Sequence, residues 1–94
     1  MWVRVVYFGL MYPYKNGTLV RGVPPGEGGP ATMGKHANEW GMIGDIMGQF
    51  EEGDLGIVLQ ARRMKGSFPQ WVYKLVTSRG VIGWTWSRLV KEVR

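Results

Sequence analysis

Few residues of this 94-residue chain could carry out chemistry. It has no cysteine and a single histidine, His36, which excludes thiolate nucleophiles, cysteine-ligated metals and histidine-rich metal sites. Three carboxylates lie together at Glu51, Glu52 and Asp54. A general acid–base pair needs a cleft that desolvates one carboxylate, whereas a turn between two short strands lies on the surface. We therefore expect no catalytic residue, no metal site and no cofactor.

One short motif matches a phosphate-binding loop. Residues 29–35 have the G-x-x-x-x-G-K spacing, in which backbone amides and the lysine hold phosphates. That chemistry also needs Ser or Thr after the lysine, with a strand before and a helix after, in a larger α/β domain. Position 36 is His, and the preceding residues are rich in proline and glycine. We interpret the match as a coincidence and expect no small-molecule substrate.

Aromatic and basic side chains are the strongest candidates for binding. Exposed rings on paired strands can stack on bases or enclose a cation, and neighbouring basic groups can contact phosphates. The same rings would otherwise fill the core of a small barrel. We expect Trp84 in the core and leave Trp71 and Trp86 open between core and surface. The candidate interaction residues are Trp71, Tyr73, Trp86, Arg62, Arg63, Lys65, Lys74, Arg79 and Arg88.

The basic residues are concentrated in the second part of the chain. Residues 1–54 have four basic and six acidic residues, a net charge of −2, whereas residues 55–94 have eight basic and one acidic, a net charge of +7. Such an asymmetry indicates a partner with a negative surface: nucleic acid, an acidic protein or a membrane headgroup layer. A basic surface that serves only solubility is the alternative.

The elements that must position these residues are short strands. Residues 2–8 and 18–20 flank an Asn-Gly pair and predict an N-terminal hairpin. The glycine and proline content of residues 22–34 predicts irregular chain, and residues 35–40 are expected to form at most one helical turn. Five further strands are expected, with a hairpin turn at 78–80 and a single 3₁₀ turn at 87–89. These strands are residues 43–48, 55–62, 71–77, 81–86 and 90–93.

Alternation within residues 55–62 predicts which side chains of this strand face inward. Leu55, Ile57, Leu59 and Ala61 share one face, while Gln60 and Arg62 point the other way, as in a half-buried strand. Five short, bent antiparallel strands are expected to close into a small barrel, because closure removes the exposed edges.

Residues 42–94 resemble the small SH3-like β-barrels encoded by many tailed bacteriophages. Gly44 and Asp45 open one strand, Gly56-Ile57-Val58 lies in the next, Gly80 is at a hairpin turn, and Gly83-Trp84 begins a strand that ends in Ser87-Arg88-Leu89. The resemblance implies a mainly β fold, a five-stranded SH3-like barrel over residues 42–94. The expected hairpin and a Gly/Pro-rich irregular arm precede it over residues 1–41, which the resemblance does not cover. Signalling SH3 domains have Pro and Tyr where this chain has Trp86 and Leu89, so proline-rich peptide recognition is not expected.

We expect a non-enzymatic interaction or structural protein, an accessory component of a phage particle or assembly. The arm would bind neighbouring protein subunits, and the barrel would fold without it. Two alternatives stay open: a basic nucleic-acid-binding module, and a phage-encoded regulator of a host protein. No apolar run reaches the roughly 18 residues of a membrane span, and the first residues lack the pattern of a signal peptide, so a location in the virion or host cytoplasm is expected. The candidate arm contacts are Trp2, Tyr7, Phe8, Tyr12 and Tyr14.

Overall fold

The computed structural model describes residues 13–66 and 70–93. Within them it has seven strands and two single-turn 3₁₀ helices, η1 (Pro25–Glu27) and η2 (Ser87–Leu89), and no α-helix. The mainly β prediction is therefore confirmed. The strands are β1 (Leu19–Gly22), β2 (Ala31–Ala37), β3 (Ile43–Phe50), β4 (Leu55–Arg63), β5 (Trp71–Thr77), β6 (Ile82–Trp86) and β7 (Val90–Glu92).

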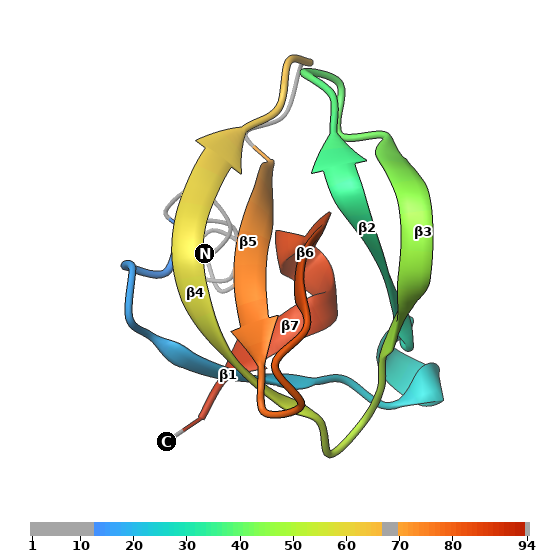
Figure 1. Ribbon diagram of the computed structural model, residues 1–94, viewed down its shortest axis with the longest axis vertical. Helices are drawn as coiled ribbons and strands as arrows, with labels where there is room; N and C mark the ends of the chain where they lie inside the picture. Colours follow the sequence, from blue (N-terminus) through green and yellow to red (C-terminus); the bar gives the residue numbers. More distant parts are fainter. Residues whose placement is uncertain (1–12, 67–69, 94) are drawn as a thin grey trace, which may run out of the picture.

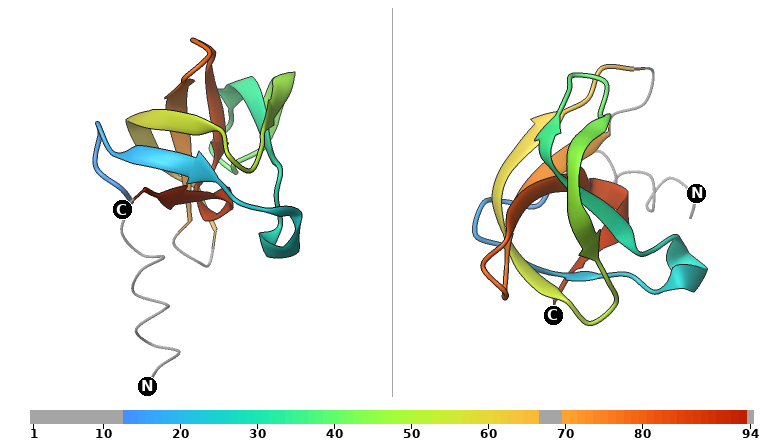
Figure 2. Two further views of the ribbon diagram at one scale, coloured as in Figure 1. Left: turned by 90° about the horizontal axis from the view of Figure 1, so that it is seen from below. Right: turned by 45° about the vertical axis from the view of Figure 1, so that its right-hand side comes forward.

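The seven strands form one antiparallel sheet in the order β3-β2-β6-β5-β4-β1-β7. The sheet curls into a half-barrel, in which β4 and β5 stand upright in Figure 1 while β1 crosses below them (Figures 1 and 2). A parallel bridge between Gly22 and Glu52 joins the end of β1 to the turn after β3. Apolar side chains fill the concave side, where Val20, Phe50 and Leu75 have no exposed surface.

The local patterns of the C-terminal part predicted their elements well. β5 and η2 have the expected bounds, and β3 and β4 extend slightly beyond them. The expected turn at residues 78–80 is present, where the Gly80 amide donates to the Thr77 carbonyl at 2.8 Å. Gly80 has a φ of 82°, a left-handed conformation that glycine adopts without a steric penalty. No helix in the described part of the chain is long and apolar enough to cross a membrane.

Residues 31–37 are the main correction to the sequence-based fold. They were expected to be irregular chain followed by a helical turn, but they form β2 between β3 and β6. Gly34 lies opposite Trp84 of β6, and a Cβ at this glycine would overlap the carbonyl oxygen of Gly44. Glycine therefore allows two backbones to approach closely here. Pairing with the neighbouring β3 and the distant β6 outweighs the weak local strand propensity.

The predicted N-terminal hairpin falls partly outside the described residues, because its first strand was expected at residues 2–8. Residues 16 and 17 do form a turn, and Gly17 has a φ of 91°. β1, however, has β4 on one side and β7 on the other, with Leu19 opposite Ile57 and Val20 opposite Glu92. Within the described residues β1 is therefore paired along both sides. The boundary expected at residue 42 falls between two strands that pair with each other, β2 and β3.

The inward face of β4 is the opposite of the one predicted. Val58 is fully buried opposite Leu75, whereas Leu55 and Leu59 are 40% and 39% exposed. The pairing register shifts between Val58 and Gln60, so Leu59 is the extra residue of a β-bulge. After the bulge the alternation is reversed, and Ala61 packs against the core as expected.

Candidate protein-interaction surface

The predicted aromatic residues divide between two apolar clusters. Tyr73 is only 3% exposed, its ring stacks on Tyr14 with centroids 5.7 Å apart, and its hydroxyl accepts a hydrogen bond from the Tyr14 amide at 2.8 Å. Burial raises the pKa of this hydroxyl above its ordinary value, although the Tyr14 amide bond opposes the shift. Tyr73 is thus a core residue, and we no longer count it among the candidate interaction residues. Half-buried Tyr14 also serves the fold, whereas Trp2, Tyr7, Phe8 and Tyr12 lie outside the described residues.

Trp84 lies in the second cluster, on the outer side of the sheet, and Trp86 packs against both clusters. Trp84 is 8% exposed and packs with Val72 and Ala37, and half-buried Trp86 lies against the same group. Trp84 is therefore buried as expected, but outside the concave core. Trp71 is half-buried, and its indole nitrogen has no hydrogen-bond partner among the described residues.

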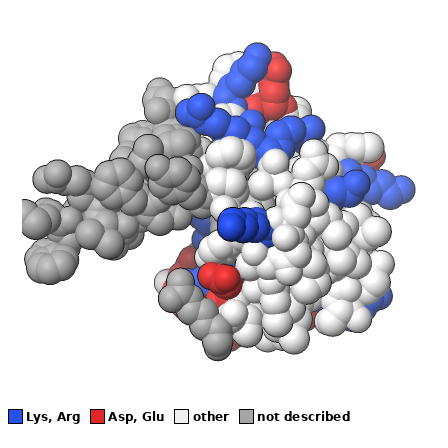
Figure 3. All heavy atoms as spheres, turned by 90° about the vertical axis from the view of Figure 1, so that its left-hand side faces the viewer, with Lys and Arg blue, Asp and Glu red and all other residues white. Residues whose placement is uncertain are grey.

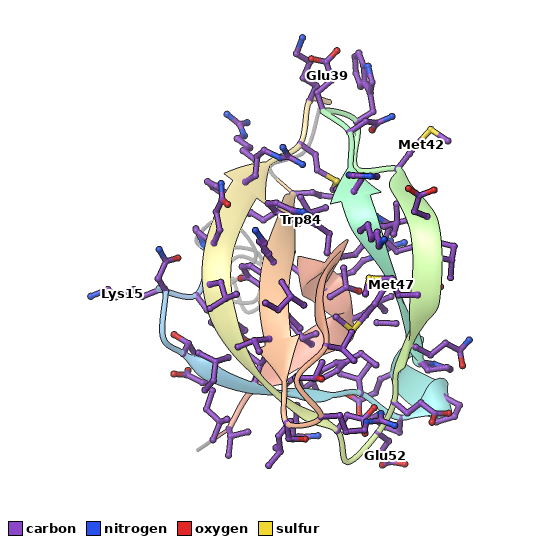
Figure 4. All side chains as sticks on the ribbon, in the orientation of Figure 1. Lys15, Glu39, Met42, Met47, Glu52 and Trp84 are labelled. Carbon is purple, nitrogen blue, oxygen red and sulfur yellow. The ribbon has the colours of Figure 1, made fainter. Side chains whose placement is uncertain are left out.

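The β2–β3 tip, which we define as residues 38–42, covers this second cluster. The indole Nε1 of Trp86 donates to the Gly41 carbonyl at 2.5 Å. The Lys65 amide donates to the Glu39 carbonyl at 2.7 Å, and Lys65 Nζ lies 3.1 Å from Glu39 Oε2. These bonds connect the tip to Trp86 of β6 and to Lys65 in the chain after β4. The tip lies at the top of the view, where Glu39 is labelled (Figure 4). The β2–β3 tip therefore packs beside the second cluster.

Most of the predicted basic residues have partners inside the chain. The Arg62 guanidinium lies 4.4 Å from the Trp84 ring centroid and hydrogen-bonds to the Ala37 carbonyl. Arg79 pairs with Asp54 at 2.8 Å, and the Arg88 guanidinium is 5.2 Å from the Trp86 ring centroid. Arg63 is exposed and Lys74 is half-buried. Lys65 Nζ lies 5.9 Å from the ring centroid of Trp40. The structure thus places Arg62, Lys65 and Arg88 beside tryptophan rings, whereas Arg79 lies in the turn after β5.

The acidic and phosphate-loop motifs have structural roles. Asp54 accepts hydrogen bonds from the Glu51 amide and from Arg79, both at 2.8 Å, and so closes the turn between β3 and β4. Lys35 and His36 lie in the extended strand β2, not in a loop that could surround a phosphate. His36 Nε2 is 3.2 Å from Asp45 Oδ2, and both side chains are mostly exposed. Within residues 13–66 and 70–93, no cluster of three metal-ligating side chains is found.

The surface that we select as the binding candidate is a group of aliphatic side chains on the outer side of the sheet, two of which, Leu55 and Ile57, the sequence analysis placed inside. Strand register sets Leu19 opposite Ile57, Ile57 opposite Val76, and Val76 opposite Ile82. Directly opposed residues have Cβ atoms about 4.5–5.5 Å apart, so the four side chains form a continuous row across β1, β4, β5 and β6. Leu55 lies beside this row, two residues before Ile57 on the same face. We call these five residues the aliphatic face: Leu19, Leu55, Ile57, Val76 and Ile82.

The aliphatic face is open to solvent. Leu19, Leu55 and Ile82 are 39%, 40% and 48% exposed, and Ile57 and Val76 are half-buried between them. On the side of the molecule where β1 and β4 lie, Figure 3 shows a broad area without Lys, Arg, Asp or Glu, bordered by a basic side chain near the centre of the view and by more basic side chains above. The concave core is made by the alternating inward residues, such as Val20, Val58 and Leu75, so this outer row is not needed to fill it.

Sequence reasoning missed this face because β4 is apolar on both sides. Residues 55–59 are all aliphatic or glycine, so alternation alone does not choose the inward set. One signal was Gly56, which has no side chain. A Cβ placed on this glycine would lie 3.4 Å from the ring of the buried Phe50. A glycine that fits against a large core ring indicates that its neighbours, Leu55 and Ile57, point outward.

No protein-family model matches the chain, and comparisons with curated proteins and with solved structures gave no match either.

Proposed function

We propose that this chain is a non-enzymatic protein-interaction module that binds its partner through the aliphatic face. The observation that carries the proposal is the continuous row of outward aliphatic side chains across four strands. Burying apolar surface contributes about 25 cal/mol per Å². Contiguous apolar patches on soluble proteins are typical of interaction sites. A partner that covers this row therefore gains binding free energy by burying it, whereas these side chains stay exposed in the isolated chain.

We further propose that β1, β4, β5, β6 and β7 correspond to the five strands of an SH3-like barrel, with the β2–β3 hairpin as an addition. Support comes from the adjacent order β6-β5-β4-β1-β7 and from η2, the single turn that precedes the last strand. In this proposal β1 takes the place that residues 43–48 were expected to fill. The resemblance to phage-encoded barrels supports an accessory role in a phage assembly, in the virion or the host cytoplasm.

The nucleic-acid alternative receives less support from the described residues. Arg62, Lys65 and Arg79 have hydrogen-bond or ion-pair partners within the chain. The exposed row is aliphatic, whereas stacking on bases requires aromatic or guanidinium planes. Binding to a host protein would use the same face as binding to a phage subunit, and the identity of the captured partner distinguishes these two settings.

Affinity capture with a matched pair of variants tests the proposal. The face variant is Leu19→Thr with Ile82→Thr, because threonine keeps strand propensity while reducing the apolar surface. The control is Met42→Thr with Ile46→Thr, which changes two apolar side chains on the β2–β3 hairpin that are more exposed than those of the face variant, at 69% and 59%. From lysate of phage-infected host cells, wild type and control should retain one stoichiometric protein that the face variant loses. Retention by all three proteins, or loss from both variants, would contradict the proposal.

A further inference from the structure

The aliphatic face lies on strands that carry only positive charge. The sequences of β1, β4, β5 and β6 contain no Asp or Glu, and their basic residues are Arg21, Arg62, Arg63 and Lys74. Asp54, immediately before β4, is bound to Arg79. An apolar surface flanked by Arg21 and Lys74 has its electrostatic complement in an apolar surface that carries negative charge.

Two of the basic residues lie on opposite sides of the aliphatic row. Arg21 is two residues from Leu19 on β1 and lies opposite Leu55. Lys74 is two residues from Val76 on β5 and lies opposite Gln60 and Trp84. Residues two apart on a strand share a face and are separated by about 6.6 Å. A partner side chain seated on the row therefore has a cation within reach on either side.

The charges of Arg21 and Lys74 also help to distinguish among the molecules that could cover the aliphatic face. Pairing two copies face to face would bring Arg21 and Lys74 against their own counterparts, which is unfavourable for like charges. A membrane-binding surface needs apolar groups that reach about 5–10 Å into the lipid, whereas Ile57 and Val76 at the centre of this row are half-buried. These observations favour a protein partner over a second copy or a lipid surface.

We propose that the aliphatic face binds a protein surface that presents aliphatic side chains together with carboxylates, which approach Arg21 and Lys74. This inference rests on the proposed function, since it identifies the chemistry of the partner that the face binds. The carboxylates contribute mainly to selectivity and to the rate of association, and the aliphatic contacts contribute most of the affinity.

Fluorescence anisotropy with two labelled peptides tests the inference. The probes are a peptide of alternating Leu and Glu and a matched peptide of alternating Leu and Lys. Wild-type protein should bind the Leu-Glu peptide about tenfold more tightly, and raising the salt from about 50 to about 300 mM should reduce this preference. Arg21→Glu with Lys74→Glu should reverse it. Lys74→Glu alone provides the same test with less risk to folding. Thermal unfolding of each variant verifies that it is folded.

The outcomes separate this inference from the proposed function. Equal binding of both peptides, lost in the Leu19→Thr and Ile82→Thr variant, would overturn the acidic partner and keep the face as an interaction site. Peptide binding that this variant does not change would overturn both, and no binding of the Leu-Glu peptide would overturn the acidic partner. A dimer in sedimentation, or binding to phosphatidylserine vesicles, that the face variant abolishes would assign the face to a second copy or a membrane instead.

Discussion

The guanidinium of Arg62 lies over the ring of Trp84, 4.4 Å from its centroid, although two strand spacings separate β4 from β6. The same guanidinium donates to the Ala37 carbonyl at the end of β2. One side chain therefore connects three strands and holds the β2–β3 hairpin against the outer side of the sheet. We therefore expect Arg62, which the sequence suggested as a phosphate contact, to stabilise the fold.

Arg62→Ala should destabilise the protein by about 1–2 kcal/mol, because it removes a cation–π contact and a charged hydrogen bond. Arg63→Ala is the matched control, because its side chain is exposed on the next residue of the same strand, and its effect should stay within about 0.5 kcal/mol. Urea unfolding followed by tryptophan fluorescence measures both. Equal effects would show that the contact at Trp84 contributes nothing to stability.

Gly34→Ala should destabilise the protein by about 3 kcal/mol or more, because the new Cβ overlaps the backbone carbonyl of Gly44 and a side chain of Ile43. Gly44→Ala provides the control, since a Cβ at that neighbouring glycine meets no atom within 4 Å. Differential scanning calorimetry of the two variants and wild type gives the comparison. A Gly34→Ala protein as stable as Gly44→Ala would mean that β2 does not pack closely between β3 and β6.

The sequence predicted those elements whose signals are local. β5, η2 and the turn at Gly80 follow from alternation, spacing and a glycine with positive φ. β2 was missed because its strand structure depends on the hairpin with β3 and on pairing with Trp84, which is distant in sequence, and not on its own strand propensity. The bulge at Leu59 likewise depends on the register with β5. The aliphatic face follows from that register, so the sequence analysis placed Leu55 and Ile57 inside.

Two substitutions in β4 test which face is buried. Val58→Ala should cost about 2–3 kcal/mol, because the Val58 side chain has no exposed surface and leaves a cavity. Leu59→Ala removes a larger side chain but should cost less than about 1 kcal/mol, because Leu59 is 39% exposed. Chemical denaturation of both variants measures the difference. If the inward face were the one predicted from alternation, the larger loss would occur at Leu59.

Tyr73 should make stability fall at alkaline pH. Its pKa is raised above 10.0 in the folded protein, mainly because burial disfavours the phenolate. Above pH 10 the unfolded chain therefore loses this proton more readily than the folded chain, so the contribution to stability is complete below that pH and decreases as pH rises. Tyr73→Phe should lose about 1 kcal/mol at neutral pH, since it removes the bond from the Tyr14 amide. It should then show a weaker decrease between about pH 9 and 11 in urea titrations. An unchanged pH dependence in this variant would place the responsible group elsewhere.

A chain that begins at residue 42 should not fold, although its sequence alone suggests a complete barrel. The truncation removes β1, which lies between β4 and β7 and contributes the buried Val20. β7 pairs only with β1 among the described strands, so the last strand would lose its partner as well. A chain that begins at Pro13 keeps every described strand and should fold, which makes it the control. Amide hydrogen exchange compares the two: protection of β4 and β5 in the Pro13 chain, and none in the shorter chain, is the expected result. Protection in both would mean that residues 42–94 form an independent domain and that β1 and β2 are additions to it.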